Sequence, residues 1–276
     1  MAMPETMVLI WMALALLAIG AFAGVLAGLL GVGGGIVLVP AFYYVFTALG
    51  YDGPQVMQIC LATSLATMIV TSTKSLQTHN RKGAVEWPIL RTWAPGIVLG
   101  AVLGALLLAQ LPTQALTMIF AVLALLVSGW MLLGNSEWRL AQQMPLGILR
   151  GALSSVVGFL SVLMGIGGGS FGVPVMTLFG VPIHRAVATA SGFGLLIALP
   201  SVAMLLFLNV QPEGHPPYTL GAVNLPAFVL TIAATLNTTK LGANLAHKMD
   251  PKPLRRLFAV FLCFVALNML RKALGF

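Results

Sequence analysis

Charged side chains are scarce in this chain of 276 residues: they make up 7% of the sequence, while hydrophobic residues make up 59%. Soluble domains carry about 25% charged residues. A chain with so little charge cannot cover a water-facing surface, so a soluble globular fold is excluded. Apolar runs of about 20 residues recur along the sequence, and each is long enough to cross ~30 Å of hydrocarbon. The sequence therefore predicts an all-α polytopic membrane protein.

Acidic residues are fewer still, with six in the whole chain. All of them fall in hydrophilic breaks or at the ends of apolar runs: Glu5, Asp52, Glu86, Glu137, Glu213 and Asp250. Cation carriers and carboxylate proton relays usually need an acidic group inside the membrane. The absence of such groups from the apolar runs argues against both, and it favours an anion as the transported species.

Cysteine is almost absent, and Cys60 and Cys263 lie in apolar runs without metal-ligand spacing. A disulfide framework and a metal site are therefore not expected, and no cofactor is predicted. Because no hydrophilic stretch is long enough for a soluble catalytic domain, the chain is not expected to be an enzyme. The net charge of +8 arises in short breaks between apolar runs and forms no extended basic face. The expected surroundings are the lipid bilayer, with no nucleic acid as a partner.

The sequence contains an internal repeat. The segment Gly31–Pro40 returns 134 residues later as Gly165–Pro174, with six of ten positions identical. Further on, Gly83-Ala-Val-Glu-Trp-Pro88 returns as Gly221-Ala-Val-Asn-Leu-Pro226, and this offset of 138 then holds to the end of the chain. Secondary transporters are often built from such duplications. The chain therefore divides into an N-terminal repeat, 1–138, and a C-terminal repeat, 139–276.

Each repeat contains five apolar segments, and the second segment is short and begins at a triple glycine. In the first repeat the segments are expected at 7–30, 33–49, 55–75, 88–109 and 113–133. In the second repeat they are expected at 145–165, 167–181, 185–208, 219–246 and 254–272.

The basic residues favour one arrangement of these segments. Ten crossings with the N-terminus outside place 12 of the 14 basic residues on the inner side, in agreement with the positive-inside rule. An odd number of crossings in each repeat inverts the second copy, so inverted five-plus-five repeats are predicted. Parallel four-plus-four repeats, with re-entrant second segments, are the alternative.

The two glycine motifs are the leading candidates for a substrate site. Glycine and proline weaken a helix, and short Gly/Pro-interrupted segments at matching places in two repeats point to a transporter site. Close packing of helices through small residues is the structural alternative. The candidate residues are Gly31, Gly33, Gly34, Gly35 and Pro40 in the first motif and Gly165, Gly167, Gly168, Gly169 and Pro174 in the second.

Hydroxyl side chains in the third segment of each repeat add to this site. Thr63 and Ser64 belong to the first repeat, and Thr189 and Ser191 belong to the second. These groups either face an anion or bond to carbonyls of their own helix, and the repetition of Thr63 and Thr189 favours a function. Lys240 is a possible counter-charge, although snorkelling to the interface is the more ordinary role for such a lysine.

Taken together, these motifs resemble the TauE/SafE family, described as sulfite or organosulfonate exporters. The resemblance rests on the paired Gly-x-Gly-Gly-Gly motifs with their Val-Pro, the Ala-Thr helices and the Gly-Ala-Val elements, and it covers roughly residues 7–272. It implies permeation of sulfite, a sulfonate or a related small anion, in a prokaryotic cytoplasmic (inner) membrane. The second repeat departs from the first at Ala190, which stands in the place of Ser64.

We therefore expect a transporter that exports sulfite or an organosulfonate by alternating access and is driven by the membrane potential. A proton-coupled carrier of organic anions or other ions and a membrane assembly partner are the alternatives. The sequence does not decide between a monomer and a homodimer, and it leaves open whether the glycine-rich segments cross the membrane or re-enter.

Overall fold

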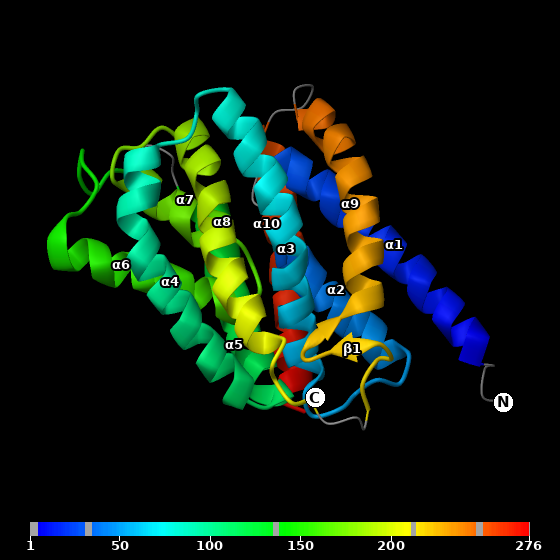
Figure 1. Cartoon of the computed structure of the whole chain (residues 1–276). Coiled ribbons are helices and arrows are strands. Elements are labelled where there is room, and N and C mark those ends of the chain that lie inside the picture. The colour runs from blue at the N-terminus through cyan, green and yellow to red at the C-terminus, as the bar shows by residue number, and fades with distance from the viewer. Residues whose placement is uncertain (1–4, 31–34, 135–137, 211–213, 247–250, 276) are drawn as a thin grey trace.

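The computed structural model describes residues 5–30, 35–134, 138–210, 214–246 and 251–275. These ranges contain ten helices, one short β-hairpin and the loops that connect them (Figure 1). The first repeat contains α1 (Glu5–Leu30), α2 (Gly35–Ala48), α3 (Val56–Arg81), α4 (Trp87–Gln110) and α5 (Thr113–Leu133). The second contains α6 (Gly147–Leu163), α7 (Gly169–Leu178), α8 (Ile183–Leu205), β1 (Thr219–Leu220), β2 (Val223–Asn224), α9 (Leu225–Ala246) and α10 (Pro251–Ala273).

The prediction of an all-α membrane protein is confirmed. Among the described residues, α3, α4, α5 and α8 are long and apolar enough to cross a membrane, and shorter apolar helices accompany them. Large apolar side chains also point outward, for example Leu126 with 63% and Leu133 with 79% of its surface exposed. Such an outer surface suits lipid and not water.

One predicted segment differs from the structure. The segment 219–246 was expected to be apolar throughout, but its first six residues form the hairpin of β1 and β2, and α9 begins only at Leu225. Tyr218 and Gly221 have positive φ angles of 60° and 54°, which turn the chain and are incompatible with a helix. The side chain of Asn224 then accepts a hydrogen bond from Ala227 N at 3.0 Å, as a helix N-cap does.

The two ends of the helix bundle are distinct. We call one the hairpin end, because it contains β1 and β2 together with residues 49–55, 206–210 and 214–218. Gly53 N donates a hydrogen bond of 3.1 Å to Gly214 O there. The opposite end contains residues 82–86, 138–146 and 179–182. We call it the basic end, because most described Lys and Arg side chains lie on the segments that meet there: Lys74, Arg81, Lys82, Arg91, Arg139, Arg150 and Arg185.

In three of the helix pairs that the sequence repeat relates, the two helices run in opposite directions. Figure 1 shows α3 running from the hairpin end to the basic end, while its counterpart α8 runs back. In the same way α4 runs toward the hairpin end and α9 away from it. Hydrogen bonds agree with this view, since α5 begins near α3 (Thr113 N to Pro54 O, 3.1 Å) and α10 ends beside the start of α5 (Gln114 Nε2 to Ala273 O, 2.8 Å).

Every extensive helix pairing joins one repeat to the other. The pairs are α1 with α9, α4 with α6, α5 with α10, and α3 with α8. Glycines allow the backbones in the first two pairs to approach closely. A Cβ on Gly24 of α1 would lie 2.8 Å from Thr235 Cα, and a Cβ on Gly104 of α4 would lie 3.0 Å from Val162 Cβ. Close approach of this kind is the usual basis of helix association in membranes.

Candidate functional site

The second glycine motif is fully described, and it forms the turn between α6 and α7. Gly165 has a φ of +60°, which favours glycine because an L side chain would crowd the backbone. Space is also short, since a Cβ at this position would lie 2.8 Å from Val39 Cγ2 and 2.9 Å from Leu61 Cδ2. Both the conformation and the packing therefore require glycine at position 165.

The first glycine motif is only partly described. Gly35 is the first residue of α2, whereas Gly31, Gly33 and Gly34 lie outside the described residues. A Cβ on Gly35 would lie 2.9 Å from Gly165 O and 3.2 Å from Ile166 Cα. The two motifs, which are far apart in the sequence, thus touch through their backbones in the interior of the molecule.

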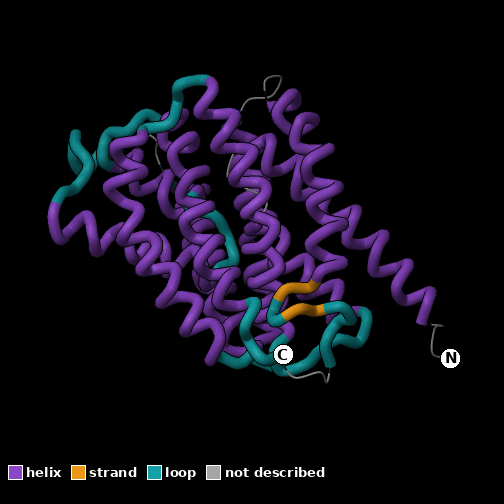
Figure 2. The backbone as a smooth tube through the Cα atoms, viewed as in Figure 1, coloured by secondary structure: helices purple, strands orange, loops and turns teal. Residues whose placement is uncertain are grey.

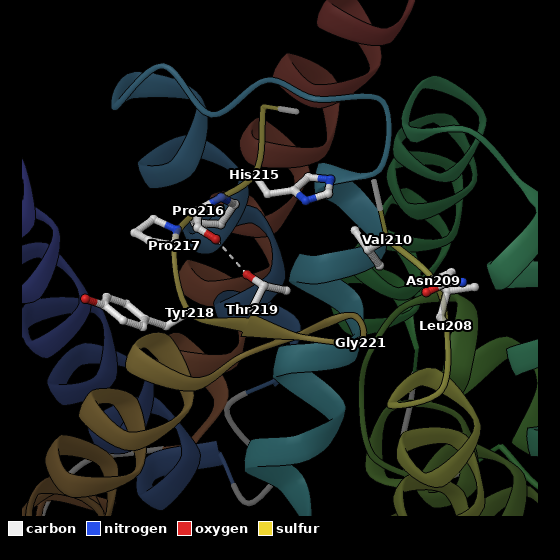
Figure 3. Close-up of a pocket in the computed structure, with 9 residues that line it drawn as sticks. All are labelled: Leu208, Asn209, Val210, His215, Pro216, Pro217, Tyr218, Thr219 and Gly221. Carbon is white, nitrogen blue, oxygen red and sulfur yellow. Dashed lines mark hydrogen bonds between the residues drawn. The ribbon is translucent and has the colours of Figure 1, made fainter. Parts of the chain in front are cut away.

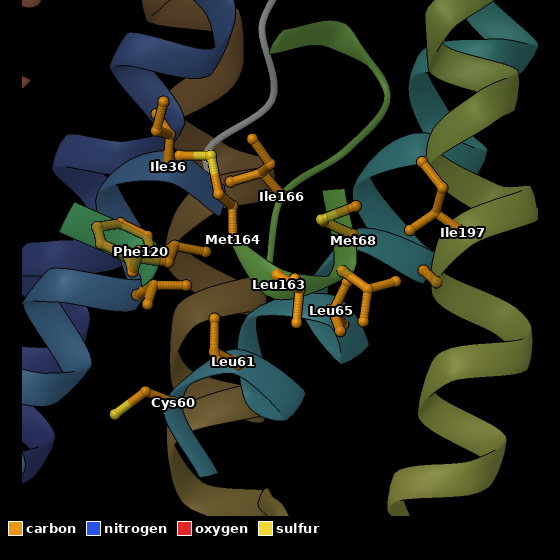
Figure 4. Packing of buried hydrophobic residues seen from close by; sticks show 14 of the residues in the cluster. Ile36, Cys60, Leu61, Leu65, Met68, Phe120, Leu163, Met164, Ile166 and Ile197 are labelled. Carbon is orange, nitrogen blue, oxygen red and sulfur yellow. The ribbon is translucent and has the colours of Figure 1, made fainter. Parts of the chain in front are cut away.

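Ser64 of α3 fixes this contact. Its Oγ donates a hydrogen bond of 2.7 Å to Gly165 O and lies 3.5 Å from Gly35 O. The hydroxyl is fully buried, so it holds the turn without help from water. Figure 4 shows the apolar side chains that enclose the crossing, with Ile36 at the start of α2 beside Met164 and Ile166.

The turn lies near the middle of the bundle. A Cβ on Gly167 would lie 3.3 Å from Met68 Cε and 3.9 Å from Gly194 Cα, and these residues are close to the midpoints of α3 and α8. Figure 2 shows the same loop deep among the helices. α7 starts there and has 10 residues, so it extends ~15 Å, about half of the hydrocarbon thickness.

The start of α7 therefore presents backbone donors at mid-depth. The first N–H groups of a helix have no partner within that helix, and the helix dipole makes this end partly positive. Pro174 and, in the first repeat, Pro40 lie inside α7 and α2. Each proline removes one further backbone hydrogen bond. An anion is the species that such a helix start attracts.

Two serines beside this turn were not among the residues predicted from sequence. Ser170, the second residue of α7, is 7% exposed, and Ser161 near the end of α6 is 0% exposed. Neither hydroxyl oxygen has a hydrogen-bond partner, although a buried hydroxyl normally has one. The repeat gave no signal for Ser170, because Ile36 occupies the corresponding position in the first motif.

Thr63 and Thr189 form a matched pair of contacts between the repeats. Thr63 Oγ1 accepts a hydrogen bond of 2.9 Å from Asn224 N, at the start of α9. Thr189 Oγ1 accepts one of 2.9 Å from Glu86 N, at the start of α4. Both threonines are completely buried. We call these two hydrogen bonds the clasps, since each ties the third helix of one repeat to the fourth helix of the other.

The clasps lie at different depths in the bundle. Ser72 of α3 meets Gly194 of α8 near the centre. Thr63 precedes Ser72 by nine residues, and Thr189 precedes Gly194 by five. Because α3 and α8 are antiparallel, the two intervals extend in opposite directions from the Ser72–Gly194 contact. Together they amount to 14 residues, so the clasps are about 21 Å apart along the bundle at a rise of ~1.5 Å per residue. Both threonines thus have a structural partner, and their contact with substrate stays a prediction.

The remaining predicted hydroxyl, that of Ser191, bonds within its own helix, and so does the neighbouring hydroxyl of Thr67 on α3. Ser191 Oγ donates to Ala188 O at 2.6 Å, and Thr67 Oγ1 donates to Ser64 O at 2.7 Å. Lys240 lies in α9, but its side chain is outside the described part of the structure. Its neighbour Thr239 bonds to Thr235 O at 2.6 Å, in its own helix. These contacts do not bring Ser191 or the region of Lys240 to the glycine crossing.

Charge is excluded from the described interior. No Asp, Glu, Lys or Arg among the described side chains is buried, and within the same residues no three His, Cys, Asp or Glu groups gather as a metal site would require. At the basic end, Arg185 forms an ion pair with Glu86, next to the clasp of Thr189. The interior site thus has hydroxyls and backbone dipoles, and the described residues add no formal charge.

A surface hollow of ≈ 350 Å³ lies at the hairpin end, away from the glycine crossing (Figure 3). Its wall includes Val210, His215, Tyr218 and Thr219. The Nε2 atom of His215 is buried without a hydrogen-bond partner, and burial lowers the pKa of this imidazole. His215 is therefore held toward its neutral form.

Comparisons with known proteins now identify the chain. The family described as "Sulfite exporter TauE/SafE" matches residues 16–269. A probable membrane transporter protein of Haemophilus influenzae is 33% identical over 258 residues, 93% of this chain and 97% of the relative. Others from Methanocaldococcus jannaschii and Bacillus subtilis are 27% and 25% identical, over 92% of this chain and 94% and 96% of the relatives. No solved structure matches the chain. The chain belongs to the TauE/SafE family of membrane transporters, which are not enzymes.

Proposed function

We propose that this transporter carries small anions, with sulfite or an organosulfonate as its substrate, and exports them across a prokaryotic inner membrane. The observation that carries the proposal is the start of α7 at mid-depth, beside the unpartnered hydroxyl of Ser170. Hydrogen bonds to charged groups contribute ~1.5 to 3 kcal/mol each. Several such donors are needed to replace the water around an anion, and the glycine turn supplies them from the backbone.

The site that we assign to the anion includes Ser64, Gly165–Gly169 and Ser170. Ser64 positions the turn through Gly165 O, and the small residues leave the amides of the turn open to a ligand. Gly167 and Gly169 are half-buried although they lie at the centre of the bundle. Gly35 of the first motif is proposed to contribute to the same site, because it touches the second turn.

We further propose that the repeats are inverted and that the basic end faces the cytoplasm, with the N-terminus outside. The opposite directions of corresponding helices support inversion, since parallel repeats would run in the same direction. The positive-inside rule supports the orientation. Arg271 and Lys272, at the far end of α10, are the described exceptions.

Membrane potential is sufficient to drive such an export. With the inside negative, an outward-moving negative charge gains ~2.3 kcal/mol per 100 mV, which corresponds to roughly a 50-fold gradient at ~1.4 kcal/mol per tenfold. The described interior has no buried carboxylate to carry a proton. This favours uncoupled movement of the anion.

The test is flux of sulfite, sulfoacetate, sulfate and chloride from proteoliposomes, with and without a potassium–valinomycin potential. Saturable sulfite or sulfoacetate flux that follows the potential without a pH gradient is the expected result. Ser170→Ala should raise the half-saturating concentration severalfold. Ser201→Ala is the matched control, because Ser201 is equally buried but bonds to Ile197 O of its own helix.

Two outcomes would contradict the proposal. Flux that needs a pH gradient would replace potential-driven export by proton coupling. A Ser170→Ala variant that is indistinguishable from the parent protein and from the Ser201→Ala control would remove α7 from the anion site.

A further inference from the structure

Eight of the ten described helices form two compact units that do not follow the sequence repeats, while α5 and α10 pack mainly on each other. α1 packs along α9, and α2 and α3 pack beside them, with the clasp of Thr63 fastening the start of α9 to α3. In the same way α6, α7 and α8 pack with α4, and the clasp of Thr189 fastens the start of α4 to α8. Each unit thus consists of the first three helices of one repeat and the fourth helix of the other. We call them the exchanged units.

Contacts inside the exchanged units are close and continuous. Three glycines on α4, Gly96, Gly100 and Gly104, meet residues of α6, and Gly20 and Gly24 of α1 meet α9. Thr235 Oγ1 donates a hydrogen bond of 3.1 Å to Gly20 O across the α1–α9 pair. In the other unit, Trp93 of α4 stacks on Phe193 of α8 with ring centroids 6.0 Å apart. These contacts run along most of the length of the helix pairs and hold the helices of each unit together.

Between the exchanged units the contact is largely confined to one helix pair. It consists of α3 against α8, together with the glycine turn. Small residues meet at two points of this boundary, where Gly194 lies against Ser72 and Ser64 reaches Gly165 O, and the larger side chains of Leu61 and Met68 lie against the glycine turn. The proposed anion site lies in the same boundary. Packed helices can shift past one another by small sliding movements.

We infer that the bodies that move during transport are the two exchanged units and not the two sequence repeats. This inference rests on the proposed transport function. The clasps stay closed throughout the cycle, because they lie inside the units. The boundary between α3 and α8 changes, and it exposes the glycine turn alternately to the two ends of the bundle.

Disulfide crosslinks distinguish the two possibilities, since all of the following pairs join one repeat to the other. Gly96→Cys with Ser154→Cys links α4 to α6 inside a unit, where the glycine Cβ position is 2.9 Å from Ser154 Cβ. Gly194→Cys with Ser72→Cys links the two units across a corresponding distance of 3.2 Å. Disulfides need Cβ atoms about 3.5–4.5 Å apart, so each pair requires a shift of only a few tenths of an ångström.

Two further cysteine pairs inside the units keep the comparison possible if the Gly96–Ser154 variant does not fold. Gly104→Cys with Val162→Cys is a second α4–α6 pair, and Gly20→Cys with Ala234→Cys links α1 to α9, each from a Cβ distance of 3.0 Å. Every variant is made with Cys263→Ser and is compared with itself before and after oxidation. Crowding by the new side chains is thereby separated from the effect of the crosslink.

The readout is sulfite flux in the oxidised and the reduced state. Oxidation of the pairs inside a unit should leave flux within about twofold of the reduced protein. Oxidation of the Ser72–Gly194 pair should lower flux at least tenfold, and dithiothreitol should restore it. If the Gly96–Ser154 crosslink blocks flux as strongly as the Ser72–Gly194 crosslink, the repeats themselves move and the inference is wrong.

A second readout needs no substrate. Cys60 is completely buried in α3, one turn from Ser64, and its alkylation by a maleimide reports opening near the glycine crossing. The Ser72–Gly194 crosslink should slow this alkylation at least fivefold, while crosslinks inside a unit should leave it unchanged. Equal slowing by both classes overturns the inference. Absence of sulfite flux in the reduced protein counts only against the proposed substrate.

Discussion

The requirement for glycine at the central turn leads to a graded prediction. Gly165→Ala faces two costs, a left-handed backbone and a crowded Cβ, whereas Gly83→Ala faces only the first. Gly83 has a φ of +64° with nothing within 4 Å of a Cβ. Gly151 faces neither cost, because it lies in α6 with a helical backbone and open space. The three alanine variants therefore separate conformation from packing.

The magnitudes follow from each environment. Gly151→Ala should stabilise the protein by ~0.5–1 kcal/mol, because alanine is the better helix former. Gly83→Ala should destabilise it by ~1–2 kcal/mol, the cost of a left-handed non-glycine residue. Gly165→Ala should have the same backbone cost and a further destabilisation of ~1–3 kcal/mol from overpacking, since its Cβ would lie 2.8 Å from Val39 Cγ2 and 3.2 Å from Leu61 Cα.

Thermal unfolding in detergent is the first assay. At ~2–4 °C per kcal/mol for a chain of this size class, Gly165→Ala should melt at least ~4 °C below the parent protein and at least ~2 °C below Gly83→Ala. Sulfite flux per folded molecule should fall severalfold for Gly165→Ala alone. A Gly165→Ala variant that is as stable and as active as Gly83→Ala would refute the argument that packing at the crossing requires glycine.

Two other predictions concern Ser64 and His215. Ser64→Ala leaves Gly165 O without its 2.7 Å hydrogen bond, so the free energy of unfolding should fall by ~1–3 kcal/mol, measured as a lower melting temperature; an unchanged value would mean that the turn holds itself. Because burial places the pKa of His215 below its usual 6.5, the folded state favours the neutral imidazole. The contribution of neutral His215 to the free energy of unfolding should be fully present above pH 6.5 and should be lost as the pH falls through the lowered pKa. His215→Gln should remove that part of the pH dependence of the melting temperature.

Sequence reasoning reached the fold class and the family because both depend on strong patterns. The apolar runs predict the helices, and the paired glycine motifs indicate the TauE/SafE family. Gly165 illustrates the success: its positive φ and its contact with Gly35 give a repeated glycine a physical reason. The prediction for Thr63 and Thr189 identified a matched pair of residues, although the structure gives both hydroxyls a backbone partner.

Other features could not be read from the sequence. Self-similarity shows which helices correspond, but it does not show which helices touch, so the pairing of α1 with α9 and of α4 with α6 was not predicted. Ser170 was missed because the search relied on repetition, and the first motif has Ile36 at that place. The hairpin before α9 was missed because residues 219–224, which include Leu220, Ala222 and Val223, continue without a charged residue into the apolar run of α9.

Two loops join the exchanged units, and both act as short links. At the basic end, the chain passes from one unit to the other through residues 82–86, and five residues can span at most ~17 Å when extended. At the hairpin end, Ala222 N donates a hydrogen bond of 2.9 Å to Leu205 O at the end of α8, and Asn224 N donates one of 2.9 Å to Thr63 Oγ1 in the other unit. A wide separation of the units therefore has to stretch a five-residue link at one face of the membrane or break the hydrogen bonds of the hairpin at the other.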